Sequence, residues 1–421
     1  MTVADAVARY VARNPASRRR AERAARVLPG GNTRSVLHFD PFPLVFERGE
    51  GPYLWALDGD RYVDLLGEFT AGLYGHSHPV ILDAIRGALE GGISFGGTNE
   101  LEHRLAELLC ERFAALELVR FTNSGTEANL MALALALHHT GRREALVFRG
   151  AYHGGVLAFG SGAPSPVTVP HAWVLGDYDD VDGTRALIRA RGGRLAAILV
   201  EPMLGSGGCI PASPAFLAML REEATAAGAL LIFDEVMTSR LGPHGVTPDL
   251  MTLGKYLAGG MSFGAFGGRA ELMAAYDPTR PGALFHAGTF NNNVVSMSAG
   301  IAGLSQVLTP DALTQLHARG DRLREALNAA AAELEAPVHV SGRGSLMTIH
   351  PGPRAYNAAE PVDERREQLK RLLFFELLDA GYWIASRGMI ALSLPVTDEH
   401  CAGFVAAFRA VLDRHAEAFR C

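Results

Sequence analysis

Two lysines stand out among the cationic side chains of this chain. The sequence holds 39 lysines and arginines, and only Lys255 and Lys370 are lysines. An arginine stays protonated in proteins, whereas a desolvated lysine can lose its proton and act as a nucleophile. Lys370 lies in the charged helical pattern EQLKRLLFFELL, which favours a solvated surface position. Lys255 lies in LMTLGKYLAGGMSFGAFGG with no other charge nearby, and this setting favours Schiff-base chemistry.

A carboxylate precedes Lys255 by 21 residues, at the end of an apolar run. Asp234 follows the four residues LLIF, so its side chain should emerge at the carboxyl end of a buried strand. A partly desolvated carboxylate needs a cation or a hydrogen-bond donor beside it. A protonated pyridine nitrogen would meet that need, and an ion pair with an arginine is the alternative.

A strand-like run, LVRFTN, leads directly into Ser124, Gly125 and Thr126 at the start of a helix. Exposed backbone N–H groups, the helix dipole and two hydroxyl groups form an anion cup that suits a phosphate. The alternative is an ordinary helix cap by a serine or threonine.

Two further residues follow strand-like runs in the same way. Tyr152 comes after ALVFRG, and an aromatic side chain there can stack on a flat ring bound over the cup. A core position is the alternative for this tyrosine. Glu201 ends the run AAILVEP.

These residues need a scaffold that brings strand ends together. Short apolar runs at 118–123, 145–150, 196–202 and 228–236 alternate with helix-length amphipathic segments. Such alternation predicts an α/β fold, with a mostly parallel mixed sheet covered by helices on both faces. Ligands of such sheets bind at the carboxyl ends of the strands.

The flanking segments have a different character. The N-terminal part predicts a helix over about 17–27 and a hairpin around Asp58–Gly59. After about residue 310 a long helix, two strands, a helix over about 363–380, a strand region and a last helix are expected. We therefore expect an N-terminal segment (1–75) that packs with a small α+β domain (310–421), and a large domain (76–309) between them.

Composition excludes several classes of function. A net charge of −6 argues against non-specific nucleic-acid binding. No window approaches the roughly 20 apolar residues of a membrane helix, and the N-terminus lacks a signal-peptide pattern. A cytoplasmic location is expected. The cysteines lack metal-ligand spacing, and His76 and His78 are more simply loop residues, so no metal site is expected.

Several motifs together resemble the class III aminotransferases, the fold-type I enzymes that include glutamate-1-semialdehyde aminomutase. They are FTNSGTEA, AYHGG, ILVEP, LLIFDEVMTSR, PDLMTLGKYLAGG and HAGTFNNN. Within that family, RSVLHFDPFPL, GEFTAGLYGHS and SRGMIALSLP resemble the bacterial β-phenylalanine aminotransferases. The resemblance covers about residues 25–415.

The resemblance implies pyridoxal 5′-phosphate (PLP) as cofactor, with Lys255 forming the Schiff base and Asp234 pairing with the ring nitrogen. It implies a homodimer in which Thr289 reaches the phosphate bound by the neighbouring subunit. The remaining cofactor contacts that it implies are Ser124, Gly125 and Thr126 at the phosphate, Tyr152 and Val236 on the two ring faces, and Glu201 nearby.

Two arginines are implied to bind substrate carboxylates. Arg34 matches the residue that holds the carboxylate of a β-amino acid, and Arg387 matches the one that holds a keto acid. A planar guanidinium binds a carboxylate through two hydrogen bonds. The expected reaction is transfer of an amino group from an aromatic β-amino acid to a 2-oxo acid such as 2-oxoglutarate or pyruvate.

The sequence departs from the relatives at three places. Leu204 stands where β-phenylalanine aminotransferases typically have glutamine, the segment before Val246 is shorter, and a proline is missing ahead of Arg387. These changes leave open the donor, its enantiomer and the preferred acceptor. An aminomutase acting on a substrate such as glutamate-1-semialdehyde and a non-catalytic PLP-fold protein are the alternatives.

Overall fold

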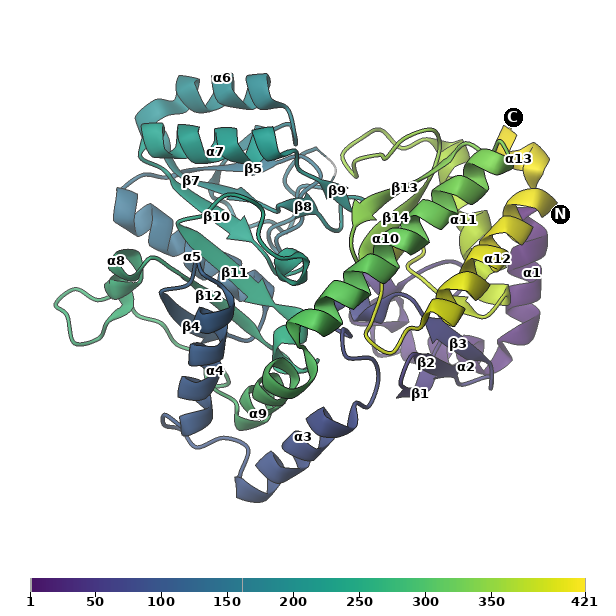
Figure 1. The fold of residues 1–421 in the computed structure, drawn as a ribbon, viewed down its shortest axis with the longest axis horizontal. Helices are drawn as coiled ribbons and strands as arrows, with labels where there is room; N and C mark the ends of the chain where they lie inside the picture. Colours follow the sequence, from purple (N-terminus) through teal and green to yellow (C-terminus); the bar gives the residue numbers. More distant parts are fainter. Residues whose placement is uncertain (1, 161, 421) are drawn as a thin grey trace. The chain divides into compact units, whose positions relative to one another are not determined.

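The computed structural model describes residues 2–160 and 162–420, which form two compact units. Unit 1 combines the N-terminal residues through His78 with Gln315–Ala355 and the chain from Pro361 onward. Unit 2 combines Pro79–Thr314 with Tyr356–Glu360. The domain boundaries expected after residues 75 and 309 stay predictions. Figure 1 follows the chain through both units.

Unit 2 is built on a seven-stranded sheet in the order β4-β12-β11-β10-β7-β5-β6. All of its strands run parallel except β12, which is antiparallel to both of its neighbours. The predicted mostly parallel mixed sheet is confirmed. Its strands are β4 (Leu118–Thr122), β5 (Glu144–Phe148), β6 (Ala172–Gly176), β7 (Leu195–Val200), β10 (Leu230–Asp234), β11 (Leu250–Gly254) and β12 (Gly264–Gly268).

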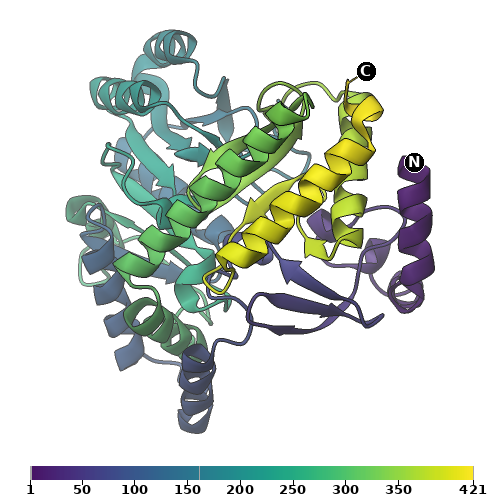
Figure 2. The same cartoon turned by 45° about the vertical axis from the view of Figure 1, so that its right-hand side comes forward.

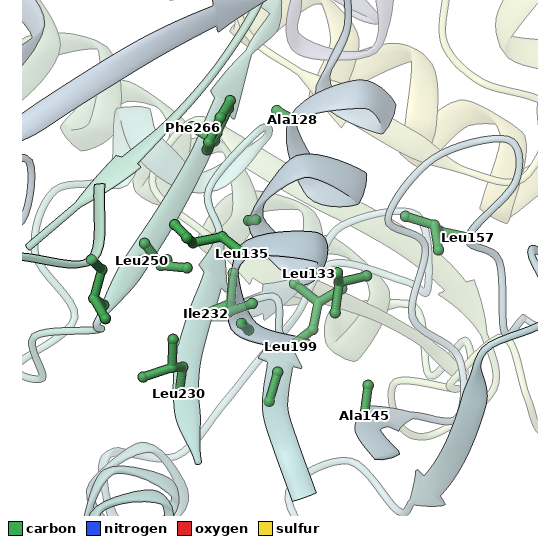
Figure 3. Close-up of a cluster of buried hydrophobic side chains, with 14 of the residues drawn as sticks. Ala128, Leu133, Leu135, Ala145, Leu157, Leu199, Leu230, Ile232, Leu250 and Phe266 are labelled. Carbon is green, nitrogen blue, oxygen red and sulfur yellow. The ribbon is translucent and has the colours of Figure 1, made fainter. Parts of the chain in front are cut away.

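Helices cover both faces of this sheet because the side chains of each strand alternate between two apolar clusters. On one face Leu199 and Ile232 pack against α5 (Gly125–Thr140), as Figure 3 shows. On the other face Ile198 and Leu231 pack against α6 (Val181–Arg191) and α7 (Pro214–Ala227). The remaining elements of unit 2 are α3 (Pro79–Gly91), α4 (Glu100–Arg112), β8 (Met203–Leu204), β9 (Ile210–Pro211), α8 (Ala270–Met273) and α9 (Val294–Ala302).

Unit 1 contains two small sheets. One sheet has the order β1-β2-β3-β15 and includes the predicted hairpin, in which Trp55 pairs with Arg61 across the turn. The other is an antiparallel sheet in the order β13-β14-β16. The strands are β1 (Phe46–Glu50), β2 (Tyr53–Ala56), β3 (Arg61–Asp64), β13 (Val338–Arg343), β14 (Leu346–Pro351), β15 (Tyr382–Trp383) and β16 (Met389–Ala391).

Long helices pack with these sheets. From Gln315 onward α10 belongs to unit 1, where it lies beside α12 in both views (Figures 1 and 2). Arg319 of α10 pairs with Asp398 of α12 at 3.1 Å. The helices of this part are α1 (Val3–Arg13), α2 (Pro15–Ala24), α10 (Pro310–Glu333), α11 (Glu364–Asp379), α12 (Asp398–Arg414) and α13 (Ala416–Arg420).

The first helix was not predicted from the sequence. α1 begins with a capping box in which Thr2 and Asp5 bond each other's backbone N–H groups. The signal was present, because the apolar residues of VADAVARYV recur at helical spacing, and Ala6 and Tyr10 of this stripe are buried.

The described helices include none that is long and apolar enough to cross a membrane. Three cysteines are free thiols, of which Cys209 and Cys401 are buried and Cys110 is half-buried. Cys421 lies outside the described residues.

Replacement of Leu133, which is fully buried between α5 and the sheet, should destabilise unit 2. We expect Leu133→Ala to lower the free energy of unfolding by about 2–5 kcal/mol, because the cavity adds to the lost burial. Urea denaturation followed by fluorescence measures the change. The control is Leu89→Ala, since Leu89 is 51% exposed. Equal, small effects of both substitutions would contradict this packing.

Candidate active site

Five parallel strands of unit 2 end at one edge of the sheet, and each is followed by a residue singled out from the sequence. Ser124 and Tyr152 follow β4 and β5. Glu201 follows β7, Asp234 is the last residue of β10, and Lys255 follows β11. Because these strands are parallel, their carboxyl ends meet at one edge.

The carboxylate of Asp234, at this edge of the sheet, accepts three hydrogen bonds. The residue is 4% exposed. Its Oδ2 accepts hydrogen bonds from Nδ2 of Asn129 (2.9 Å) and Nδ1 of His153 (2.8 Å), and its Oδ1 accepts one from the N–H of Val236 (3.0 Å). A carboxylate offers about four acceptor positions, so these donors leave one, on Oδ1, for a donor from a ligand.

The sequence patterns did not predict a functional role for Asn129 or His153. Asn129 also donates to the carbonyl of His153 (3.0 Å), and its Oδ1 accepts from Thr252 (2.7 Å). A signal was present, because Asn129 is a lone amide on the apolar, sheet-facing side of α5, where a buried polar group needs partners. We infer that both residues orient Asp234.

The anion cup is formed by the first turn of α5. Ser124 caps the helix by accepting the N–H of Glu127 at 3.2 Å. A Cβ on Gly125 would lie 2.7 Å from a methyl carbon of Val236, and one on Gly154 would lie 2.2 Å from Oγ1 of Thr126. Glycine at both positions therefore lets the cup approach the segments that follow β10 and β5.

Glu201 and Tyr152 are joined through the backbone. Oε2 of Glu201 accepts the N–H of Tyr152 (3.0 Å), and Oε1 accepts the N–H of Gly205 (3.0 Å). Burial raises the pKa of Glu201 to about 7, although nearby His153 acts in the opposite direction. The residue Tyr152 itself is 46% exposed, which leaves its ring open to a ligand and disfavours the alternative of a core position.

The two lysines lie in different settings. Lys255 is half-buried and has a positive φ of 56°, directly after β11. Left-handed backbone at a bulky residue is strained and is concentrated at functional sites. Lys370 lies on α11, where its side chain is 22% exposed and forms an ion pair with Glu367 at 2.7 Å. It is therefore half-buried, and not in the solvated position expected from the sequence.

Thr289 lies in an exposed segment that precedes α9. Two residues further on, Oδ1 of Asn291 accepts a hydrogen bond from Asn123 at 2.9 Å. Asn123 immediately precedes Ser124 of the cup, so the Thr289 segment is tied to the cup within the same unit.

Arg34 and Arg387 lie in unit 1, and both contact one aromatic ring. The guanidinium carbons of Arg34 and Arg387 are 5.5 and 5.1 Å from the centre of the Phe69 ring. Arg34 also donates to the carboxylate of Glu68. Two arginines that stand 353 residues apart in the sequence therefore contact the same ring.

The described residues contain no group of three or more His, Cys, Asp or Glu side chains arranged to hold a metal ion. The chemistry available at the strand ends is that of one lysine, one strongly held carboxylate and an anion cup.

Comparison with known proteins agrees with this chemistry. The pattern of the class III aminotransferases matches residues 37–169 and 178–412. The chain belongs to this family.

Among the relatives of this class III aminotransferase is the β-phenylalanine transaminase of Variovorax paradoxus. It is 52% identical over 98% of this chain and 96% of that protein. The crystal structure of the β-phenylalanine aminotransferase from Variovorax paradoxus has a TM-score of 0.95 and covers 99% of this chain and 97% of that chain. A glutamate-1-semialdehyde 2,1-aminomutase of Nitrosospira multiformis is 37% identical over 86% of this chain and 91% of that protein.

A class III aminotransferase works with PLP. A solved transaminase with PLP bound is 33% identical, with a TM-score of 0.88, and covers 97% of this chain and 99% of that chain. The residues present fit this cofactor, since the cup suits its phosphate and the remaining acceptor position of Asp234 suits a ring N–H. The enzyme is therefore a PLP-dependent transaminase that takes an amino donor and a keto acid.

The raised pKa of Glu201 makes stability depend on pH. Because the pKa of about 7 in the folded protein exceeds the ordinary value of 4.5, the folded state holds the proton more tightly than the unfolded state. This stabilising effect is full below about pH 4.5 and is lost as the pH rises through 7. From about pH 5 to pH 8, Glu201 should therefore lower the free energy of unfolding by on the order of 3 kcal/mol.

Urea denaturation of the cofactor-free protein across this pH range measures the effect. Glu201→Gln should remove this part of the pH dependence, whereas Glu50→Gln, at an exposed side chain of β1, should keep the wild-type slope. An unchanged slope in Glu201→Gln would contradict the assignment.

Proposed function

We propose that this transaminase moves the amino group of an aromatic β-amino acid of the β-phenylalanine type to a 2-oxo acid such as 2-oxoglutarate or pyruvate. The proposal rests on the pair of guanidinium groups, Arg34 and Arg387, that lie over the same ring of Phe69. Two carboxylate receptors suit an enzyme whose donor and acceptor both carry a carboxylate. The 52% identity with the Variovorax enzyme supports the same donor.

The residues at the strand ends would hold the cofactor. Lys255 is proposed as the Schiff-base residue, and Asp234 as the partner of the protonated ring nitrogen. The other proposed contacts are the phosphate ligands Ser124, Gly125 and Thr126, the ring neighbours Tyr152 and Val236, and Glu201 at the edge of the site.

When bound, PLP accepts the electrons that are released as the carbon bearing the amino group loses its proton. The Nζ of Lys255 takes that proton as a base and returns it as an acid within the same half-reaction. Asp234, held by three donors, keeps its charge directed at the ring nitrogen and so keeps that nitrogen protonated.

The choice of a β-amino acid follows from where the carboxylate is held. In a β-amino acid the reacting carbon is one bond further from the carboxylate than in an α-amino acid. We assign the donor carboxylate to Arg34 and the carboxylate of the 2-oxo acid to Arg387. Separate receptors suit a donor and an acceptor whose reacting carbons lie at different distances from their carboxylates.

We further propose that the enzyme is a homodimer and that it is located in the cytoplasm. Thr289 is exposed next to the cup, which suits a contribution to a second copy of the chain in a homodimer. Residues 76–309 are proposed as the cofactor-binding domain. The composition of the chain is compatible with the cytoplasm.

An aminomutase is the second candidate, because an aminomutase is 37% identical to this chain. An aminomutase would use the same lysine but would release no keto acid. The pair of arginines favours transamination, since an aminomutase has a single substrate.

Titration of the holoenzyme with each enantiomer of β-phenylalanine, without acceptor, tests the proposed donor. One enantiomer should bleach the visible band of the lysine-bound cofactor and yield pyridoxamine phosphate and a 3-oxo acid. Lys255→Ala should abolish turnover, whereas Lys370→Ala should retain it, because Lys370 is paired with Glu367 on α11 and does not lie at a strand end of the large sheet. A band that persists with both enantiomers but bleaches with another amine would refute the β-phenylalanine assignment.

Steady-state kinetics separates the two arginines. Arg34→Gln should raise KM for the β-amino acid by about 10- to 100-fold, because a hydrogen bond to a charged group is lost. Arg387→Gln should raise KM for the 2-oxo acid by a similar factor. The control is Arg48→Gln, at an exposed arginine that pairs with Glu50. Equal effects of both substitutions on both substrates would contradict separate receptors.

A further inference from the structure

The segment that carries Phe69 has an unusual backbone. Three consecutive residues other than glycine have positive φ, namely Glu68 (47°), Phe69 (51°) and Thr70 (82°). This left-handed region is disfavoured for side chains with a Cβ and persists only where the surroundings enforce it. The segment therefore holds its side chains in place against a local cost.

Contacts on both sides enforce this conformation. Oδ1 of Asp64 accepts the N–H groups of Leu66 (2.9 Å) and Gly67 (3.0 Å), and Oδ2 of Asp64 lies 2.8 Å from Nε2 of His76. On the other side, a Cβ on Gly67 would lie 2.8 Å from the carbonyl oxygen of Ala391. Asp64 is itself 4% exposed, so the anchor is rigid.

This backbone conformation places the carboxylate of Glu68 within hydrogen-bond distance of Arg34. Nη1 of Arg34 donates to Oε1 of Glu68, and the two side chains are 46% and 52% exposed. Phe69 is 9% exposed, and the centre of its ring lies 5.5 Å from the guanidinium carbon of Arg34. Arg34 thus has one buried apolar support and one exposed acidic partner.

We propose that Glu68 is an internal competitor for Arg34, and this proposal rests on the proposed function. The Glu68 carboxylate occupies the guanidinium in the substrate-free enzyme, and the carboxylate of the β-amino acid displaces it. Exposed ion pairs contribute little, less than about fivefold in an equilibrium constant, so an incoming carboxylate can replace one. The contact with Phe69 keeps Arg34 in place while Glu68 is displaced.

Competition between Glu68 and the substrate carboxylate would help product release in the reaction cycle. The 3-oxo acid formed from a β-amino acid keeps its carboxylate and must leave before the acceptor enters. Return of Glu68 to Arg34 favours that release. Glu68 therefore limits the affinity for any carboxylate at Arg34, whether or not the ligand carries an amino group.

Calorimetric titration of the holoenzyme with 3-phenylpropanoate tests this role, because this carboxylate lacks the reactive amino group. Glu68→Gln should lower its Kd by about 2- to 5-fold, the range that an exposed ion pair contributes. Glu68→Asn, which removes the charge with a residue that tolerates left-handed backbone, should do the same. The matched control is Glu50→Gln, which removes the acid of another exposed pair (3.0 Å from Arg48) and should leave Kd unchanged.

The effect should depend on Arg34. In an Arg34→Gln background, Glu68→Gln should leave the Kd of 3-phenylpropanoate unchanged. Binding by both Glu68 variants that equals or falls below wild type would overturn the proposal, as would a gain that persists without Arg34.

The half-reaction with β-phenylalanine, measured on the same preparations, separates the two proposals. If the wild type gives no half-reaction but Glu68→Gln still tightens 3-phenylpropanoate, the proposed donor is wrong and the role of Glu68 stands. If the half-reaction proceeds and both Glu68 variants bind as the wild type does, only the role of Glu68 is wrong.

Discussion

A buried carboxylate at the end of β10 is the constraint on which the active site depends. Asp234 is 4% exposed, and an ionised carboxylate at such a place is costly unless donors surround it. The donors come from three segments: Asn129 on α5, His153 after β5, and the backbone of Val236. The same hydrogen bonds that stabilise the carboxylate therefore hold the start of α5, the segment after β5 and the end of β10 relative to one another.

This arrangement explains which parts of the site could be read from the sequence. Asp234 ends an apolar run that was predicted as a strand, so its place at a strand end is a local property. Lys255 was singled out by its residue type and its uncharged surroundings, and the strand that precedes it, β11, was not predicted. The roles of Asn129 and His153 are not local, because Asn129 is 105 residues and His153 is 81 residues from Asp234 in the sequence. Their types alone fit many positions, and only the parallel order of the strands brings them together.

The same distinction holds for unit 1. The hairpin and the long helices were predictable from turn residues and periodicity, and α1 carries the same periodic signal although it was not predicted. Arg34 and Arg387 were selected by resemblance, among many arginines. Nothing in the sequence predicts left-handed backbone at Glu68 and Phe69, because it is imposed by Asp64 and by close packing against β16.

The claim that Asp234 faces the ring nitrogen of the cofactor can be measured directly. Holoenzyme reconstituted with PLP labelled with ¹⁵N at the ring nitrogen reports its protonation in the nitrogen NMR spectrum. We predict that the ring nitrogen is protonated in the wild type and loses this proton in Asp234→Ala. Asp249→Ala, at another buried carboxylate, is the control and should keep the nitrogen protonated. An unprotonated nitrogen in the wild type, or one that stays protonated in Asp234→Ala, would contradict it.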